Sequence, residues 1–159
     1  MISSMIEELT DVGELTEDIG FLLARVSGEV VRATNAALAP EGLRVRHYSV
    51  LLLACDSPDG ISQRAVARIL GLDPSQVVAL VDELAKAGLV QRQPAPTDRR
   101  AKLVTATGAG CRVRERAAAR AAEAEQGALR SLSGDEREVL RALLSRVAES
   151  ASAAAYAFE

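Results

Sequence analysis

Two short amphipathic segments joined by only two residues, Gly71 and Leu72, constrain the fold of this chain more than any other feature of its sequence. Ser62 can cap a first helix over residues 63–70, and Gly71 can end that helix. Two helices joined so closely form a helix-turn-helix. The inward face expected for the first helix consists of Ala65, Val66, Ile69 and Leu70.

Three independent signals predict where the second helix begins. Asp73 is a strong N-cap residue, Pro74 suits the first helical position, and Gln76 occupies the reciprocal position of a capping box. The helix is expected to extend to Gly88, with an apolar face at helical spacing. In DNA-binding helix-turn-helix proteins, this second helix enters the major groove. The residues expected on its inward face are Val77, Leu80, Val81 and Leu84.

The hydrophobic period changes after Gly88. Leu89 to Pro94 is a predicted strand, and Ala101 to Thr105 is the predicted return strand. The segment between them contains Pro96 and Asp98 and is predicted to be a loop. A β-hairpin that follows a helix-turn-helix directly is a wing.

Helical patterns also precede this region. A long amphipathic helix is expected from an N-cap at Thr16 to the breaker cluster Pro40-Glu41-Gly42. A second, buried helix is expected from Val45 to Cys55. The apolar stripe of the first helix consists of Leu22, Val26, Val30, Ala33 and Ala37.

Two further helices are expected after the wing. Thr107 can cap a helix that continues to Ala128, and a capping box of Ser133 and Glu136 can open the last helix. The predicted fold class is therefore mainly helical with a small β-hairpin wing. The apolar stripe of the last helix consists of Val139, Leu140, Leu143, Leu144 and Val147.

The charge of the chain is unevenly distributed, although the net charge is only -3. Residues 61–116 carry ten basic and five acidic side chains, whereas residues 1–43 carry two basic and eight acidic ones. A basic middle between acidic ends is expected when one part of the molecule faces an anionic partner. Solvated helix faces explain the same charges equally well.

The composition argues against several functional classes. The 159 residues suffice for one stable domain. A structural zinc site is not expected, because the sequence has only one histidine and two cysteines and no C-x-x-C pair. We expect no cofactor, and no enzyme, because the sequence has no Gly-rich phosphate loop of useful spacing and no evident base or nucleophile. The acidic start does not suit a signal peptide, and the longest apolar run, Val50 to Cys55, is too short for a membrane span. A cytoplasmic protein is expected.

Several short motifs occur in a recognisable order along the chain. They are Gly42-Leu43, Ala67 to Leu72 (ARILGL), Val81 to Arg92 (VDELAKAGLVQR), Thr97 to Ala101 (TDRRA) and Thr105 to Gly110 (TATGAG). Together they resemble the MarR (multiple antibiotic resistance regulator) family of winged helix-turn-helix transcription regulators. The flanking helices also fit this family, so the resemblance covers most of the chain.

The resemblance implies a single MarR-like domain over residues 1–159 that forms a homodimer. Residues 14–39 and 108–155 would supply dimerisation helices, and residues 44–106 would form the DNA-binding lobe. The two lobes of the dimer would face successive major grooves of a palindromic double-stranded operator. Repression is the default mode, because a dimer on the operator can exclude polymerase.

The first set of candidate DNA contacts lies on the second helix of the motif. Gln76 can pair with adenine, Ser75 can donate to a phosphate or base edge, and Val78 or Ala79 can touch a thymine methyl. A solvated helix face is the alternative for all four. The Gln76 side chain also cannot cap the helix and read a base at once.

The second set lies on and around the wing. Arg99 and Arg100 suit insertion into a narrow minor groove, and Asp98 can orient an arginine beside it. Arg92 suits a phosphate, and an internal salt bridge to Asp98 is its alternative. The remaining candidates for phosphate contacts are Lys102 on the return strand, Arg64 and Arg68 on the first helix of the motif, and Arg112 after the wing.

Members of the resembled family commonly release DNA when a small aromatic, often phenolic or anionic, molecule binds between the helical layer and the lobe. The residues expected at such a pocket here are His47, Tyr48, Leu51 and Arg25. A lone histidine is alternatively a surface or satisfied residue.

Two rival functions stay open. Some relatives sense peroxides through a cysteine, and Cys111 lies among arginines that can lower a thiol pKa, although Cys55 and Cys111 are alternatively inert thiols. The other rival is a dimeric helical module that binds protein. The run Asp98-Arg99-Arg100 after a well-capped helix favours DNA binding over protein binding. On DNA it has a clear physical use, whereas none is obvious on a protein partner.

Overall fold

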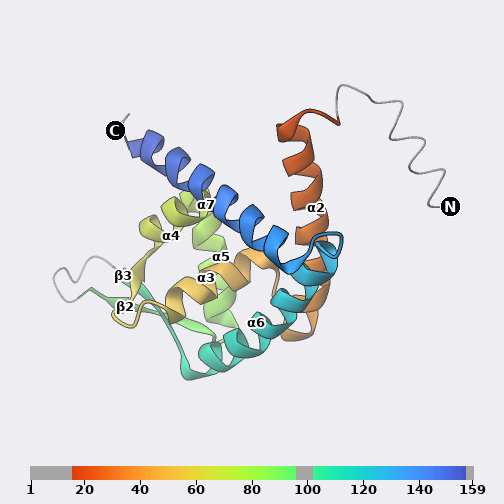
Figure 1. Ribbon diagram of the computed structural model, residues 1–159. Coiled ribbons are helices and arrows are strands. Elements are labelled where there is room, and N and C mark those ends of the chain that lie inside the picture. The colour runs from red at the N-terminus through yellow and green to blue at the C-terminus, as the bar shows by residue number, and fades with distance from the viewer. Residues whose placement is uncertain (1–15, 96–101, 157–159) are drawn as a thin grey trace. The chain divides into compact units, whose positions relative to one another are not determined.

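The computed structural model describes residues 16–95 and 102–156, which are mostly helical with one small sheet (Figure 1). This confirms the predicted fold class. The helices are α2 (Ile19–Leu38), α3 (Val45–Cys55), α4 (Gln63–Leu70), α5 (Pro74–Lys86), α6 (Gly108–Ala128) and α7 (Gly134–Tyr156), with a short 3-10 helix, η1 (Ala39–Glu41), after α2. The strands are β1 (Ile61–Ser62), β2 (Val90–Pro94) and β3 (Lys102–Ala106).

The predicted helix caps after α3 are present. The Ser62 hydroxyl accepts from the Ala65 amide, and Thr107 Oγ1 accepts from the Gly110 amide. Ser133 and Glu136 form the reciprocal capping box, with Ser133 N donating to Glu136 Oε2 at 2.7 Å. These caps act locally, which is why the sequence predicts them well.

The predicted N-cap of the first helix is wrong by two residues. Asp18, not Thr16, caps α2, because its backbone is extended and its carboxylate accepts from the Phe21 amide at 2.6 Å.

The sheet is antiparallel and has the strand order β1-β3-β2. The wing hairpin pairs Val90 with Ala106 and Pro94 with Lys102. The predicted first strand starts one residue too early, because the Leu89 amide donates to Leu84 O and completes the end of α5. The return strand runs to Ala106, one residue beyond its predicted end, and its predicted first residue, Ala101, lies outside the described residues.

Strand β1 is absent from the sequence prediction. Ile61 pairs with Val104 and Ser62 with Leu103, so that β1 extends the wing by a third strand. A strand of two residues has no alternating pattern to detect. The wing is therefore attached to the start of α4 as well as to the end of α5.

The hydrophobic core contains residues from α3, α4, α5 and the sheet. On α5 the inward residues are as predicted. On α4, however, Ile69 is exposed and Ala67 is buried. Ala67 and Ile69 are about 200° apart around the helix, so they cannot share one face. The fully buried side chains of the core include Leu38, Val50, Leu51, Val66, Val77, Val81, Leu84 and Val104.

The chain divides into two compact units, residues 1–125 and residues 126–159. The expected single domain stays a prediction. Leu22 and Val26 of the predicted α2 stripe are exposed, whereas its other three residues are partly buried. Most of the α7 stripe is exposed, including Val139 and Val147. No helix in the described ranges is long and apolar enough to span a membrane.

Candidate nucleic-acid interface

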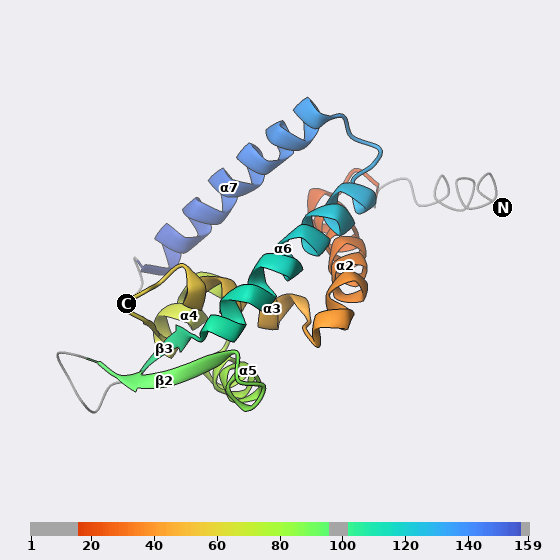
Figure 2. The same cartoon turned by 90° about the horizontal axis from the view of Figure 1, so that it is seen from below.

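Helix α5 presents a polar surface opposite to its buried face. Ser75, Gln76, Val78, Ala79 and Asp82 are all exposed, as the helical pattern predicts. The helix packs against α3, α4 and β2, and Figure 2 shows the start of β2 next to it. The exposed face of α5 is thus held beside the wing by a packed core on its other side.

The cap of α5 leaves the Gln76 side chain unused. The Asp73 carboxylate accepts from the Ser75 amide at 2.8 Å and from the Ser75 hydroxyl at 2.6 Å. These two hydrogen bonds, the hydroxyl first, lower the pKa of Asp73. Within the described ranges the side-chain amide of Gln76 makes no hydrogen bond, so the reciprocal capping role predicted for it is not found. Gln76 is free to read a base, whereas the Ser75 hydroxyl hydrogen is already engaged.

Arg92 joins the wing to both helices of the motif. Its guanidinium lies 2.7 Å from Asp82 Oδ1 on α5 and donates to Gln63 Oε1 on α4 at 3.1 Å. The internal partner of Arg92 is therefore Asp82, while Asp98 lies outside the described residues. A partly exposed salt bridge contributes at most about 1 kcal/mol to stability, so its main effect is to orient the wing strand against the two helices.

The other basic side chains of residues 61–116 divide into engaged and unengaged ones. Arg114 pairs with Asp56 at 3.2 Å, and Arg116 pairs with Glu41 at 2.8 Å. Within residues 16–95 and 102–156, the unengaged basic side chains of this region are Arg64, Lys86, Lys102 and Arg112. Three of these four are predicted phosphate contacts. Arg68 is exposed on α4, and Arg99 and Arg100 lie outside the described residues.

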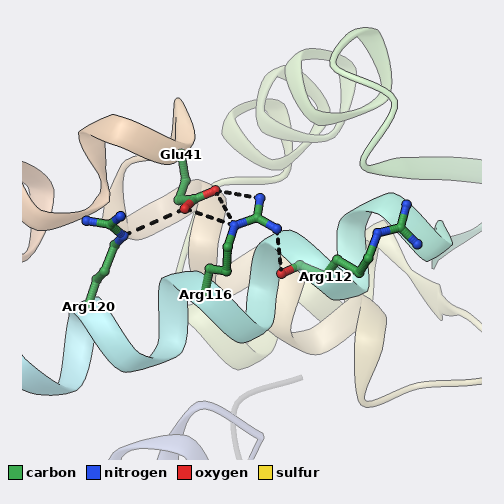
Figure 3. Close-up of polar contacts among 4 residues, drawn as sticks. All are labelled: Glu41, Arg112, Arg116 and Arg120. Atoms are coloured by element: carbon green, nitrogen blue, oxygen red, sulfur yellow. Dashed lines mark hydrogen bonds and ion pairs between the residues drawn. The ribbon is translucent and has the colours of Figure 1, made fainter.

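Glu41 binds η1 to α6 through two arginines (Figure 3). Arg116 donates to both carboxylate oxygens of Glu41, and Arg120 Nε lies 3.7 Å from Oε1. The hydrogen bond from Arg116 lowers the pKa of Glu41, although partial burial opposes this. Arg112 contributes only its carbonyl to Arg116, and its own guanidinium points away from Glu41. These contacts explain why Arg116 and Arg120 do not belong to the candidate interface.

His47 connects α3 to α5. Its Nδ1 accepts from the Arg44 amide at 3.3 Å, so Nε2 carries the hydrogen and donates to Glu83 Oε2 at 2.7 Å. Both ring nitrogens are therefore satisfied inside the chain. The contact also gives Glu83 on α5 a partner on α3. The two residues are 36 positions apart, and no local pattern in the sequence could have indicated their pairing.

The remaining residues expected at an effector pocket differ in their surroundings. Leu51 is fully buried in the core, and Tyr48 is partly buried against it. Arg25 is exposed on α2. Within the described ranges, neither the Tyr48 hydroxyl nor the Arg25 guanidinium has a hydrogen-bond partner. A ligand could reach these two side chains without breaking an existing polar contact.

Comparison with known proteins identifies relatives along most of the chain. A family model described as MarR family matches residues 41–101. A putative transcriptional regulatory protein for the hcr operon of Thauera aromatica is 30% identical over 138 residues, covering 85% of this chain and 81% of the relative.

Solved structures of two regulators that share the name CouR are also similar. The structure of CouR from Rhodococcus jostii RHA1 bound to p-coumaroyl-CoA is 50% identical, covers 84% of this chain and 94% of that chain, and has a TM-score of 0.77. The transcriptional repressor CouR bound to a 23-mer DNA duplex is 34% identical, covers 86% of this chain and 96% of that chain, and has a TM-score of 0.77. With its fold, its motifs and these relatives in agreement, the chain belongs to the MarR family of transcriptional regulators.

Proposed function

We propose that this regulator is a homodimeric repressor that binds a palindromic operator and releases it when a phenolic effector binds. The observation that carries this proposal is the exposed face of α5, which is packed beside the wing. On this face the side-chain amide of Gln76 has no partner in the described part of the chain. A glutamine amide can make two hydrogen bonds to the major-groove edge of adenine. Val78 and Ala79 on the same face suit the methyl group of thymine.

The unengaged basic side chains support a phosphate-binding role around this face. Arg64 lies on α4, Lys102 on β3 and Arg112 on α6, so they come from three separate elements of the chain. Such contacts add affinity for any DNA sequence and make binding depend on salt. Arg68, Arg99 and Arg100 are proposed to contribute in the same way.

The proposed dimer is supported by the large apolar side chains that a single chain leaves exposed on α2 and α7. Exposed apolar patches are typical of protein interfaces. A two-fold symmetric dimer presents two copies of α5, and a palindromic operator matches that symmetry.

The proposed operator recognition is tested by enriching genomic DNA fragments on the purified protein and measuring binding of the best fragment. Gln76→Ala is expected to weaken binding to that fragment by about 1–3 kcal/mol and to leave binding to unrelated DNA unchanged. Lys102→Ala is the matched control, because loss of a phosphate contact lowers the affinity for all DNA sequences alike. If no fragment is enriched, the DNA-binding proposal fails and a protein partner becomes the better candidate.

The proposed effector is a phenolic compound, and p-coumaroyl-CoA is the first one to test. CouR from R. jostii, which is 50% identical to this chain, was solved with that ligand bound. In this chain the unpartnered Tyr48 hydroxyl can donate a hydrogen bond to a phenol or accept one from it. Arg25 can pair with an anionic group. His47 and Leu51 would contact the ligand only after they leave their present positions.

We would measure release of the operator fragment by p-coumaroyl-CoA, by p-coumarate and by free coenzyme A. The comparison shows which part of the ligand is required. We expect the thioester to release DNA. Tyr48→Phe should raise the p-coumaroyl-CoA concentration needed for release by about tenfold, because a lost hydrogen bond of roughly 1.4 kcal/mol corresponds to that factor. Tyr156→Phe is the control variant. Equal release of wild type and Tyr48→Phe would remove Tyr48 from the effector site.

A further inference from the structure

The two cysteines of the chain lie side by side in the fold. Cys55 is the last residue of α3, and Cys111 lies in the first turn of α6, 56 positions later in the sequence. The Cys55 thiol donates to Cys111 Sγ at a sulfur-to-sulfur distance of 3.5 Å, and both residues are partly buried. The 159 residues contain no other cysteine.

The surroundings of the pair restrain its reactivity without abolishing it. Burial, followed by the hydrogen bond to Cys111, raises the pKa of Cys55 to about 12, whereas the Arg114 guanidinium acts in the opposite direction. Arg114 also holds the same two elements together by pairing with Asp56 at 3.2 Å. A thiol pair of this kind is stable in the reduced form and reacts with disulfide reagents through the small thiolate fraction.

We propose that Cys55 and Cys111 form a redox-active dithiol that closes into an intrachain disulfide. The oxidant class is a low-molecular-weight disulfide. The thiolate of one cysteine attacks a sulfur of this reagent, breaks its S–S bond and leaves a mixed disulfide, while the displaced thiolate takes up a proton. The second cysteine then loses its proton and attacks the protein sulfur, which expels the second small thiol. Two protein thiols are oxidised to one disulfide, and the reagent is reduced to two thiols.

Proximity favours the closing step over any competing reaction. The resolving thiol is already in contact with the sulfur that it must attack, so closure is intramolecular and needs no second external thiol. Formation of the bond shortens the sulfur-to-sulfur distance from 3.5 Å to about 2.05 Å. The end of α3 and the first turn of α6 must therefore move closer together.

The first turn of α6 has little freedom to move by itself. Thr107 Oγ1 donates to Gly88 O at 2.7 Å, and the Thr107 amide donates to Leu89 O at 3.0 Å. A Cβ placed on Gly110 would lie 2.0 Å from Leu89 O, so the two backbones are in close contact. Gly88 and Leu89 connect α5 to β2. Displacement of α6 by the disulfide therefore moves the base of the wing, and we expect it to alter DNA binding. This regulatory part of the inference rests on the proposed DNA-binding function.

Treatment of the reduced full-length protein with glutathione disulfide tests the disulfide directly. The intact mass is expected to fall by two hydrogen atoms, the chain to stay monomeric on a non-reducing denaturing gel, and the peptides containing Cys55 and Cys111 to be linked. Cys55→Ser and Cys111→Ser should each retain one glutathione, because the resolving thiol is absent. Wild-type protein that keeps glutathione adducts, or that links to a second chain, would overturn the proposed pair.

The regulatory part is tested by measuring operator affinity before and after oxidation. We expect oxidation to weaken DNA binding about tenfold, within the usual range for coupling between two sites, and reduction with dithiothreitol to restore it. The Cys55→Ser, Cys111→Ser double variant should be unaffected by the oxidant. An unchanged affinity of the disulfide form would overturn the regulatory part. Failure of the reduced protein to bind any operator would instead overturn the proposed function, and the mass measurement would still decide the disulfide.

Discussion

Gly110 shows how a single residue sets the distance between α6 and the end of α5. A Cβ at this position would lie 2.0 Å from Leu89 O and 3.1 Å from Leu51 Cδ1. Neither neighbour can move easily, since one is backbone and the other is a side chain in the core. Only glycine allows this approach.

Gly110→Ala is therefore expected to destabilise the fold by about 1–3 kcal/mol, the usual cost of overpacking. Gly127→Ala in the same helix is the matched control, because no atom lies within 4 Å of its added Cβ. The control should stabilise the protein by about 0.5–1 kcal/mol through helix propensity. Urea unfolding of both variants measures these differences. A neutral Gly110→Ala would mean that the contact with Leu89 is looser than described.

Glu41 predicts a pH dependence at the scale of one residue. Because the Arg116 hydrogen bond lowers the pKa of Glu41 in the folded chain below its ordinary value of 4.5, the ionised carboxylate stabilises the folded state. This contribution is complete above pH 4.5 and is lost as the pH falls through the lowered folded pKa. Glu41→Gln should therefore be less stable than wild type at neutral pH, and the difference should shrink in acid.

Unfolding free energies of wild type and Glu41→Gln, measured across this range, check the prediction. Glu115→Gln is the control, because Glu115 is exposed on α6 next to Arg116 and has no partner in the described part of the chain. A difference that stays constant with pH would contradict the role of the Arg116 pair.

At the scale of secondary-structure elements, Arg92 determines how the wing meets the helix-turn-helix. It contacts α5 through Asp82 and α4 through Gln63, and it lies on β2 itself. Its guanidinium is therefore engaged on the protein side. Lys102 on β3 is exposed and has no such partner in the described ranges.

This contrast predicts different salt dependences for two wing variants. Arg92→Ala is expected to weaken operator binding without changing the slope of log affinity against log salt, because it disturbs the orientation of the wing. Lys102→Ala is expected to reduce that slope by about 1, because it removes a phosphate contact. Fluorescence anisotropy at several salt concentrations separates the two. A reduced slope for Arg92→Ala would instead support the direct phosphate contact expected from the sequence.

At the scale of the whole molecule, one chain alone leaves apolar surface uncovered. The exposed side chains include Leu22, Leu23 and Val26 on α2, and Val147 on α7 is 65% exposed. The first half of α2 follows the predicted stripe but has little of this chain to pack against. The proposed dimer covers such a surface.

Val26→Glu is expected to shift the protein from dimer to monomer and to weaken operator binding at least tenfold, because a charge cannot be buried in an apolar interface without a partner. Ser27→Glu is the control, since it adds the same charge at the neighbouring exposed position. Sedimentation velocity measures the assembly state. A Val26→Glu protein that stays dimeric would place the interface elsewhere.

The positions that sequence reasoning predicts best are those where the cause is local. Ser62, Asp73, Thr107 and Ser133 each cap a helix within three residues of themselves. Such contacts form whenever the local backbone turns helical, so the residue types alone indicate them. The exposed face of α5 follows from the same helical period.

Contacts between distant residues were decided only by the tertiary structure. Arg92 pairs with Asp82, His47 with Glu83, and Cys55 with Cys111, and none of these pairs has a local signal. Ile69 has an apolar side chain on an amphipathic helix and is nevertheless exposed. The physical reason is the same in each case. Side-chain partners depend on how packed elements are rotated and spaced against one another, and that arrangement results from the core as a whole.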